Sequence, residues 1–445
     1  MKSFLPLLLL LSFNTFSATF TVNSTSDTVD IAPGDGVCLD GIGDCSLRAA
    51  IMESNVFKGA DTVYLQRSTT YELTLVAGAT DASFGDLDIL DSLTLSIINP
   101  GTVTQSADEL PVIDANGIGR VIDVFNATSV TLFAVVITGG DTSNEVFNMG
   151  GGILVNTPIT TNFNVLNSIV FGNFSEQGAG IQTYAAESLI SFTDISFNGL
   201  LDGDSFTKGA GINNEGGDTT IQYSSIHNNA VNFNTPVCFG SVQNSSIDSD
   251  MFIFNSTIAL NGTSPFNNCL TGVNGVQSSL FLVNATVTYN SGWGLSSSDS
   301  SGNKDLFIRN TIIATNSIND CRLKNHNGMI NFGDANGGHN IASDVSCNMP
   351  AISGNMEITD PKLDEFKAVF PGFFPTFIYF EPLPDSPAID NGSPLAVNVG
   401  DPNACQQFDQ ILRLRPIDGN GNGSAVCDIG AVENNYDLIF KSDFE

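Results

Sequence analysis

The chain has 445 residues, enough for one large solenoid or for two to three ordinary domains. Its 47 acidic residues outnumber the 15 Lys and Arg residues and give a formal net charge of −32. This charge excludes the nucleic-acid-binding proteins, disfavours binding to anionic lipid surfaces, and is typical of soluble secreted proteins.

Residues 1–18 have the composition of a secretory signal. Lys2 supplies the positive start, residues 5–11 form the apolar core, and Ser17 and Ala18 offer cleavage points. The apolar run is too short to cross a bilayer, and no later segment is long and apolar enough to do so. We therefore expect an exported protein with no membrane span, either extracellular or at the cell surface.

Residues 19–60 are expected to form an N-terminal cap. A short strand and a turn-rich loop come first, and Asp44 or Ser46 can then cap a short helix over residues 46–55. The apolar face of this helix would cover the open end of the first coil, as the terminal units of solenoids require.

Two short sequence motifs recur between residues 136 and 316. One is a glycine cluster followed by isoleucine, at residues 150–153, 178–181 and 209–212. The other is a short apolar strand that ends in asparagine, with spacings of 25, 30, 33, 29 and 26 residues between successive asparagines. A period of this size indicates stacked units, each too small to bury its apolar face alone. The asparagines of this motif are Asn173, Asn198, Asn228, Asn261, Asn290 and Asn316.

The content of each unit predicts an all-β fold, a right-handed parallel β-helix over residues 61–345. The strands are short and alternate in polarity, and no segment keeps a helical apolar period. The glycines suit corners with positive φ or close approach of the coils. The asparagines suit a left-handed conformation and bonds between coils, and the 32 phenylalanines are expected to stack inside. A propeller or sandwich is the alternative, although a blade repeat is longer, about 40 residues.

Residues 346–435 are expected to form a loop-rich C-terminal cap, followed by a tail at 436–445. One stretch of the cap alternates oxygen-bearing side chains and glycines as calcium-binding loops do, but Ile429 stands where such loops place a bidentate Glu. The alternative is a plain Gly/Asn-rich turn. The calcium ligands would be Asp418, Asn420, Asn422, Ser424 and Asp428.

The eight cysteines of an exported chain suggest disulfides. Neighbours in a solenoid are neighbours in sequence, so we expect four local pairs, although sequence alone does not prove the connectivity. A zinc site is the alternative, but C-x-x-C spacing is absent. The expected pairs are Cys38–Cys45, Cys238–Cys269, Cys321–Cys347 and Cys405–Cys427.

Motifs at both ends resemble a known family. Residues 45–51 read Cys-Ser-Leu-Arg-Ala-Ala-Ile and resemble the Cys-Ser-Leu-Arg-Glu-Ala signature of many secreted bacterial proteins, with Ala49 in place of the usual Glu. Residues 385–392, 409–416 and 427–433 resemble the motifs of the choice-of-anchor Q domain. The chain is thus similar, over nearly all its mature length, to the CSLREA and choice-of-anchor Q proteins. The resemblance implies a pectin-lyase-like β-helix and no defined activity.

Candidate catalytic residues are sparse. Asp202 with Asp204, and Asp248 with Asp250, offer the paired carboxylates of a glycosidase, although their Ser- and Gly-rich surroundings are typical of solvated loop acids. A pectate-lyase-type site would need calcium-binding acids together with Arg or Lys. The basic residues between positions 61 and 310 do not cluster in sequence, and the histidines are too few and scattered for a triad or metal site. These residues are Arg67, Arg120, Lys208, Lys304 and Arg309, and His227, His326 and His339.

Two functions remain after this survey. The first is a non-catalytic, adhesin-like exported β-helix, a monomer that interacts with a cell-surface glycan or protein, with calcium as the one candidate cofactor. The second is a polysaccharide lyase or glycoside hydrolase on the same fold, since β-helices host both. A cluster of acids with Arg or Lys on adjacent coils would favour the enzyme, and the sequence shows none, so we favour the first.

Overall fold

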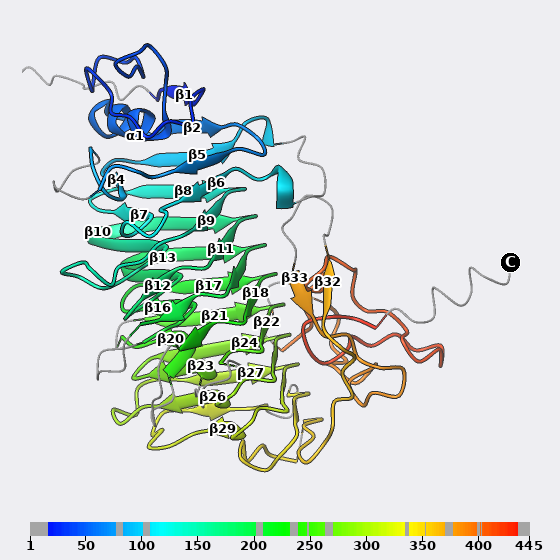
Figure 1. The fold of residues 1–445 in the computed structure, drawn as a ribbon. Helices are drawn as coiled ribbons and strands as arrows, with labels where there is room; N and C mark the ends of the chain where they lie inside the picture. Colours follow the sequence, from blue (N-terminus) through cyan, green and yellow to red (C-terminus); the bar gives the residue numbers. More distant parts are fainter. Residues whose placement is uncertain are drawn as a thin grey trace, which may run out of the picture.

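The computed structural model describes residues 17–76, 83–100, 107–201, 208–231, 239–246, 249–262, 270–333, 338–351, 353–369, 377–397, 401 and 403–434. These residues form a right-handed parallel β-helix whose coils stack from the N-terminal end downward in Figure 1. The C-terminal cap lies beside the later coils of this solenoid. The predicted signal at residues 1–18 falls almost wholly outside the described residues.

Parallel ladders form the walls of the solenoid, as predicted, and two strands, β10 (Ile153–Leu166) and β13 (Ile181–Ser191), run through both columns of the largest sheet. The first column contains β1 (Thr19–Thr21), β2 (Asp61–Leu65), β5 (Leu93–Ile97), β8 (Ser129–Phe133), β10, β13, β17 (Thr219–Gln222), β21 (Asp250–Phe254), β24 (Ser279–Val283), β27 (Leu306–Arg309) and β30 (Ile330–Asn331). The second column contains β4 (Leu87–Ile89), β7 (Ile122–Val124), β10, β13, β16 (Ile212–Asn214), β20 (Phe239–Asn244), β23 (Leu270–Val276), β26 (Trp293–Ser298) and β29 (Asn319–Arg322).

A ten-stranded parallel sheet forms a further wall of the solenoid, and a three-stranded parallel sheet adds to three of its coils. The ten-stranded sheet contains β3 (Thr70–Glu72), β6 (Val112–Asp114), β9 (Val136–Thr138), β11 (Ile169–Phe171), β14 (Asp194–Ser196), β18 (Ser225–His227), β22 (Thr257–Ala259), β25 (Thr286–Thr288), β28 (Ile312–Ala314) and β31 (Ile341–Ala342). The three-stranded sheet contains β12 (Phe174–Ser175), β15 (Gly199–Leu200) and β19 (Ala230–Val231). Since β1 already pairs with β2, the strand ladder begins earlier than the boundary expected at residue 61.

Inward-facing aliphatic side chains stack in register from coil to coil. One such column takes one inward-facing residue from each of nine successive strands of the first strand column, and all of its members are fully buried. Burying each of these side chains stabilises the fold by about 1.5–3 kcal/mol relative to exposure, which explains why short strands rich in Val and Ile suffice. The column is Val63, Leu95, Leu132, Val165, Ile190, Ile221, Ile253, Leu282 and Ile308.

The recurring asparagines form a buried ladder, as predicted, with one correction. Each side-chain amide donates to the amide oxygen of the next coil at 2.9–3.1 Å. The third member is Asn229, whereas the sequence prediction chose Asn228. The prediction of left-handed backbone at the ladder was also wrong, because the positive φ falls one residue earlier, as at Phe197 (55°) and Asn228 (52°). The ladder is Asn173, Asn198, Asn229, Asn261, Asn290 and Asn316.

The glycine clusters serve both of the expected purposes. Gly178, the first glycine of its cluster, has a φ of 54°, which a side chain would strain. Gly180, the last glycine of the same cluster, lies so close to the next coil that an added Cβ would stand 2.5 Å from the carbonyl oxygen of Gly211. Glycine therefore sets both the turn and the coil-to-coil approach.

The phenylalanines correct another expectation. Phe252 and Phe281 stack with ring centroids 4.7 Å apart, Phe307 continues the stack at 6.1 Å, and all three are half-buried on the outer side of their strands. The stack therefore lies outside the solenoid. Strands of adjacent coils lie about 4.8 Å apart, a spacing that lets the ring of one coil pack against the ring of the next. The phenylalanine stack therefore helps to hold neighbouring coils together.

Helix α1 (Leu47–Val56) covers the first coil. Ser46 is its N-cap, and its hydroxyl accepts the backbone N–H of Ala49 at 3.0 Å. Arg48 is buried and pairs with Asp27 at 2.5 Å. The expected capping helix is therefore present, and its one buried cation is neutralised by a buried carboxylate. A short 3₁₀ turn, η2 (Ala107–Glu109), lies farther along the chain.

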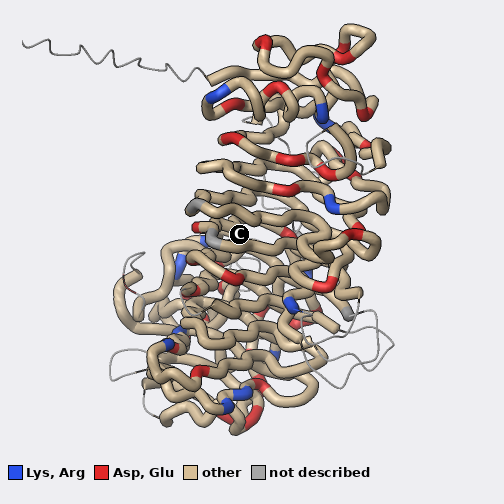
Figure 2. The backbone as a smooth tube through the Cα atoms, turned by 90° about the vertical axis from the view of Figure 1, so that its left-hand side faces the viewer, with Lys and Arg blue, Asp and Glu red and all other residues tan. Residues whose placement is uncertain are grey.

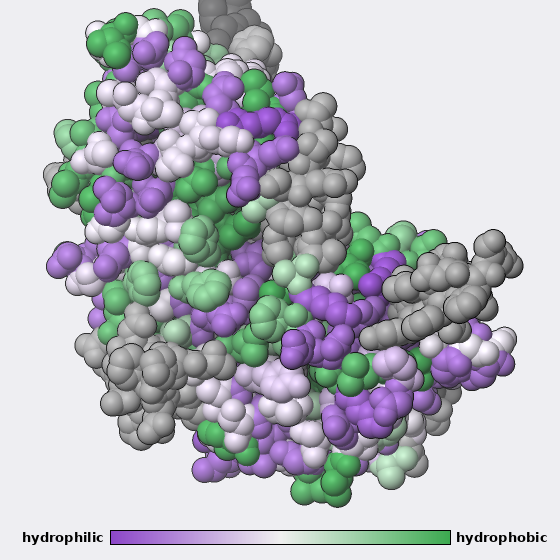
Figure 3. All heavy atoms as spheres, turned by 45° about the vertical axis from the view of Figure 1, so that its right-hand side comes forward, coloured by the Kyte–Doolittle hydropathy of each residue, from purple (hydrophilic) through white to green (hydrophobic). Residues whose placement is uncertain are grey.

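The C-terminal cap contains an antiparallel pair, β32 (Lys367–Val369) and β33 (Phe377–Tyr379), and is otherwise loop-rich. Its Gln410 accepts the Thr257 hydroxyl and donates to the Ser224 carbonyl, and the Ala431 backbone donates to the Thr286 hydroxyl. The cap therefore docks on the ten-stranded sheet. Figure 3 shows green and purple residues interspersed over the coloured part of this side of the molecule.

Disulfides join Cys38 to Cys45, Cys321 to Cys347 and Cys405 to Cys427, the same partners that the sequence suggested. Cys238 and Cys269 lie outside the described residues. Among the described helices, none has the length and apolar character needed to cross a membrane.

Candidate functional site

One outward-facing column of side chains runs along the second strand column of the large sheet. Its members are in register from coil to coil, because successive residues of a strand point to opposite faces. Amides in its middle bond to one another, with Asn213 donating to Gln182 at 2.8 Å and Asn274 donating to Gln243 at 2.7 Å. The column is Asp88, Asp123, Leu154, Gln182, Asn213, Gln243, Asn274, Ser296 and Arg322, so it is acidic at one end and basic at the other.

A groove of about 260 Å³ opens at the basic end of this column. Small side chains of the middle coil, Ser296 and Ser298, form its floor, and the larger side chains of the coils above and below form its walls. The groove thus forms where the short serine side chains of one coil lie between the longer side chains of its two neighbouring coils. The groove, hereafter the serine groove, is lined by Asn274, Val276, Ser296, Ser297, Ser298, Arg322, Lys324 and Asn325.

Trp293 holds one wall of the serine groove in place. It begins β26, and the Cζ atom of Arg322 on the next coil lies 4.4 Å from the centroid of its ring. A guanidinium over an indole face gains about 0.5–2 kcal/mol from the ring quadrupole, so Arg322 is positioned although its side chain is exposed. The groove therefore combines hydroxyls, amides, an oriented cation and a second cation, Lys324.

The opposite end of the column holds a cluster of acids around one arginine. Arg120 is nearly buried and lies 2.9 Å from Asp86, 3.3 Å from Asp123 and 3.2 Å from Glu145. Burial raises the pKa of Asp123 to about 6, helped by the charges of Asp86 and Glu145 and opposed by Arg120. Oxygens of Asp86, Asp88 and Asp123 lie within 4.8 Å of one another and could hold a cation, but Arg120 already supplies positive charge there.

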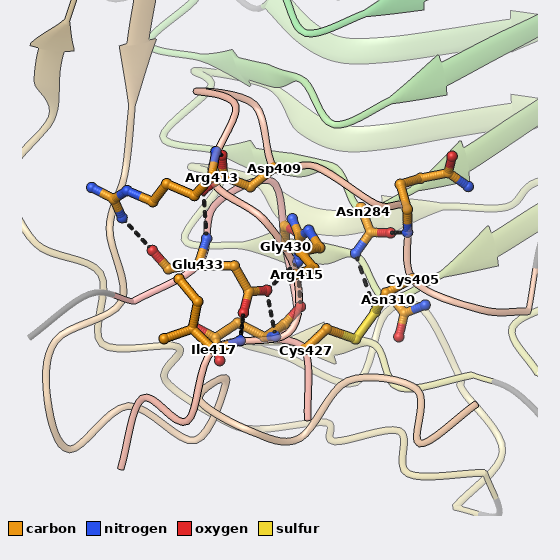
Figure 4. Close-up of polar contacts among 12 residues, drawn as sticks. Asn284, Asn310, Cys405, Asp409, Arg413, Arg415, Ile417, Cys427, Gly430 and Glu433 are labelled. Atoms are coloured by element: carbon orange, nitrogen blue, oxygen red, sulfur yellow. Dashed lines mark hydrogen bonds and ion pairs between the residues drawn. A yellow bond between two sulfur atoms is a disulfide. The ribbon is translucent and has the colours of Figure 1, made fainter. Parts of the chain in front are cut away.

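A buried network of charges holds the C-terminal cap together (Figure 4). Arg415 donates to Glu433 at 2.6 Å and to the Gly430 carbonyl at 2.9 Å, and both ionic side chains are fully buried. Burial raises the pKa of Glu433 and, more strongly, that of Asp428, which the charge of Glu433 raises further. These shifted carboxyls resemble a catalytic pair in their electrostatics. However, neither is exposed to solvent, so a polymer cannot reach them.

The predicted calcium loop is an exposed turn from Asn420 to Ala425. The carboxylate of Asp418 accepts the backbone N–H groups of Asn422 and Gly423, and Asn422 accepts that of Ser424. Asp428 is not brought to this turn, because its oxygens accept backbone N–H groups of Asp390 and Asn434 in the buried network. Asp390 stands beside the turn instead, accepting the Asn420 N–H. Calcium binding by the loop stays a prediction.

The predicted pairs of acids remain incomplete. Asp202, Asp204 and Asp248 lie outside the described residues. Asp250 is half-buried at the start of β21. The structure therefore shows one member of the second pair and no member of the first.

His227 lies in a buried polar cluster beneath the cap. Its Nε2 lies 2.8 Å from Oδ2 of Asp194, which also accepts the Ser225 hydroxyl at 2.6 Å. Burial lowers the pKa of His227, but the charge and hydrogen bond of Asp194 outweigh it and hold the pKa above its ordinary value. Because Ser225 donates to Asp194 and not to the imidazole, the group lacks the bond that activates a serine nucleophile.

The other two histidines lie far apart in the fold. His326 shares a hydrogen bond with the Ser297 hydroxyl at 3.0 Å, close to the serine groove. His339 contacts the Asn391 carbonyl oxygen at 2.9 Å where the last coil meets the cap, and burial lowers its pKa.

Two further cavities are larger than the serine groove. One, of about 370 Å³, lies where the cap meets the last coil and contains His339 and Asp390. The other, of about 450 Å³, lies at the last coil beside Cys347. Neither is lined by Lys or Arg, and the second has no charged lining residue. The serine groove is the candidate site because its side chains offer the most varied chemistry.

Sequence reasoning missed the serine groove because its survey of basic residues ended at position 310. Arg322 ends β29, and Lys324 lies two residues further on, in the turn that follows this strand. This pair of cations, with Trp293 one coil earlier, was the available signal. It could be used only once the period of the repeat fixed which residues stand opposite one another.

Comparisons with known proteins support the fold alone. No family model matches the chain, and no curated protein matches it. One solved structure, described as the crystal structure of pectate lyase Pel9A, matches with a TM-score of 0.51, 13% sequence identity, and coverage of 94% of this chain and 96% of that chain. The likeness shows the pectate-lyase-like β-helix, and the CSLREA and choice-of-anchor Q resemblance stays an expectation.

Proposed function

We propose that the chain is an exported β-helix protein that binds a glycan at or near a cell surface and does not cleave it. The observation that carries this proposal is the serine groove. Hydroxyls, amides and cations that line a shallow open hollow match the hydroxyl-rich surface of a sugar, and the exposed walls leave room for a chain that extends beyond the groove. The three disulfides support export, because such bonds form in oxidising compartments.

Hydrolysis of a glycosidic bond needs two carboxyl groups on either side of it. The residues that line the serine groove include no Asp or Glu. Hydrolysis there would therefore lack both its acid and its base.

Elimination by a lyase is the competing mechanism, because Arg322 or Lys324 could take a proton. Its other requirement is a group of acids that holds a calcium ion against the uronate. The described acids suited to this, Asp88 and Asp123 with Asp86, stand at the other end of the column. Five coils separate Asp123 from Asn274, about 24 Å at the spacing of parallel strands. The candidate proton-accepting cations and the candidate calcium-binding acids of a lyase site are therefore too far apart to act on one sugar unit.

A glycan array and a cleavage screen on the purified mature chain test the proposal. We expect saturable binding to at least one glycan class. We expect no release of reducing ends or unsaturated uronides from pectin, alginate or neutral glucans, with or without calcium. Filling the groove with Ser298→Phe should weaken binding at least tenfold, whereas Thr74→Phe, on an exposed site far along the chain, should leave it within twofold.

Two results would count against this function. Release of unsaturated uronides that stops in Ser298→Phe would make the chain a lyase. A chain that binds nothing on the array, while its thermal unfolding shows it folded, would remove glycan binding altogether.

A further inference from the structure

Cations are scarce in this chain, and nine of the 13 described Lys and Arg residues are already paired with carboxylates. Figure 2 shows acidic residues along the whole solenoid and few basic ones. The ion-paired cations serve the fold or its surface and are not available to a ligand. They are Arg48, Lys58, Arg67, Arg120, Lys208, Lys362, Lys367, Arg413 and Arg415.

Arg322 and Lys324 are not among these nine ion-paired cations. In the described part of the chain, no carboxylate lies within ion-pair distance of either side chain, although acids outnumber bases by 47 to 15 in the sequence. Both side chains are exposed, and both line the serine groove. Two unneutralised cations side by side repel each other, so their placement indicates an anionic partner that is not part of the fold.

We infer that the serine groove binds an oligosaccharide that carries anionic groups, carboxylate or sulfate, through Arg322 and Lys324. The inference rests on the proposed glycan binding and names the class of glycan. Arg322 is held over the Trp293 ring, and the edge of its guanidinium can still donate two parallel hydrogen bonds to a carboxylate or sulfate. Lys324, in the turn just after this strand, can neutralise a second anionic group, while Ser296, Ser298 and Asn274 face the sugar hydroxyls.

The net charge of −32 sharpens the specificity of this site. An anionic chain is repelled by most of the solenoid, including the acids at the far end of the same column, and is attracted only where the two cations stand. Short acidic oligosaccharides should therefore be sufficient ligands, because a longer chain reaches toward repelling coils.

Trp293 is the single tryptophan of the chain and lies against Arg322, so its fluorescence reports on this groove. Three hexasaccharides of equal length serve as probes: an oligogalacturonate with carboxylates only, a heparin-derived sulfated oligomer, and neutral maltohexaose. We expect a saturable fluorescence change with one or both acidic probes and none with maltohexaose at the same concentration. The arm that binds identifies carboxylate or sulfate as the anion.

The matched variants separate the groove from net charge. Arg322→Gln/Lys324→Gln should weaken acidic binding at least tenfold, and Lys58→Gln/Lys362→Gln, which removes two charges elsewhere on the surface, should leave it within twofold. Calorimetric titration repeats the measurement, because Arg322→Gln itself alters the surroundings of Trp293. Circular dichroism confirms that each variant is folded.

Equal binding of maltohexaose, or unchanged acidic binding by the Arg322→Gln/Lys324→Gln variant, would overturn this inference and leave general glycan binding standing. If no oligosaccharide binds in the titration or on the array, both the inference and the proposed function fall.

Discussion

The side-chain amide of Asn229 donates to Oδ1 of Asn261 at 3.1 Å, and the same oxygen accepts the backbone N–H of Asn229 at 3.0 Å. Asn229 repeats this relationship toward the preceding coil, where its own Oδ1 accepts both N–H groups of Asn198. Its amide also donates to the Ile195 carbonyl. A side chain buried inside the solenoid thus has every polar atom satisfied, which the interior of a protein demands.

Replacing Asn229 should therefore cost more than a single hydrogen bond. Asn229→Ala leaves the Asn198 amide, the Ile195 carbonyl and the Asn261 amide oxygen short of partners, each at about 1–3 kcal/mol, so we expect the unfolding free energy to fall by about 3 kcal/mol. Asn229→Asp keeps the shape of the side chain but loses its N–H donors, and it should lower the unfolding free energy by at least as much as Asn229→Ala. Chemical denaturation measures both variants.

Asn303→Ala is the control, because Asn303 is exposed in the loop before β27. Its unfolding free energy should stay within about 0.5 kcal/mol of the parent value. Equal stability of Asn229→Ala and Asn303→Ala would show that the ladder adds nothing to the fold.

The ladder also shows how far the sequence alone could go. The period, the strands, the glycine roles and the bonds between asparagines all follow from local pattern, because each coil meets only its neighbours. The choice between Asn228 and Asn229 did not follow, since adjacent asparagines satisfy the same pattern and only the register shows which one points inward. The phenylalanines were misplaced for the same reason, because an alternating strand has an inner and an outer face and both here carry apolar residues.

The site was harder to predict than the fold. The acids around Arg120 come from residues 86, 123 and 145, three separate turns of the chain that the coil geometry brings together. The serine groove depends on small residues standing opposite large ones on neighbouring coils. Both need exact register along the second strand column, where successive coils are 22 to 35 residues long, and the variable loop lengths of this chain hide that register in the sequence.

The pKa values of His227 and His339 should be shifted in opposite directions from the ordinary value of histidine. Asp194 holds the pKa of His227 above its ordinary value of 6.5, and burial holds that of His339 below it. Two-dimensional NMR of the imidazole signals across pH 5–8.5 should show one histidine titrating above and one below this value. Asp194→Asn should lower the pKa of His227 alone. A His227 midpoint at or below 6.5 in the unaltered protein would contradict the ion pair.

The stability of the protein should rise on mild acidification. A carboxyl whose pKa is raised in the folded state stabilises the fold below its unfolded pKa, near 4, and that contribution is lost as the pH rises through the folded value, about 6 for Asp123. Burial raises the pKa values of Asp409, Asp428 and Glu433 in the same direction. We expect an unfolding free energy about 1–2 kcal/mol higher at pH 5 than at pH 7.5 from Asp123 alone.

Asp123→Asn removes this titration and should flatten the profile between pH 4 and pH 6.5. Asp250→Asn, a half-buried acid on another column of the same sheet, should leave the profile unchanged in shape. Denaturant unfolding at several pH values provides the comparison. A parent protein whose stability instead rises steadily from pH 5 to pH 7.5 would show that Asp123 is ionised at little cost.

The turn at residues 418–424 should bind calcium weakly, because it holds four of the five predicted ligands and Asp428 lies in the buried network. One carboxylate and three neutral side chains give a dissociation constant of about 10⁻⁴–10⁻³ M, as in extracellular modules. Calorimetric titration with calcium should show this heat, and Asp418→Asn should abolish it. Asp428→Asn should leave it intact, because Asp428 faces the buried network. The absence of any calcium heat would make the stretch a plain turn.

Arg415 and Glu433 should matter for attachment of the C-terminal cap. The arginine is fully buried and donates to Glu433 and to two backbone carbonyls, so Arg415→Met would leave a carboxylate buried without its cation. Breaking one side of such a pair costs about 3–5 kcal/mol. Arg415→Lys keeps the charge but loses the forked donors, and we expect an intermediate loss. Denaturant unfolding followed by limited proteolysis shows whether the cap opens before the solenoid.

The double variant Arg415→Met/Glu433→Gln separates charge from packing. It removes both charges together, so it should be less destabilised than Arg415→Met alone, because no ionised group is then buried without a partner. The cap contacts the solenoid through hydrogen bonds of Gly430 with Asn310 and of Ala431 with Thr286. Loss of the Arg415 contacts should loosen the cap from these anchors, so we expect proteolytic fragments of the cap only in Arg415→Met and Arg415→Lys. If the double variant is as unstable as the sum of its single changes, the network stabilises the cap through shape and not through the pairing of its charges.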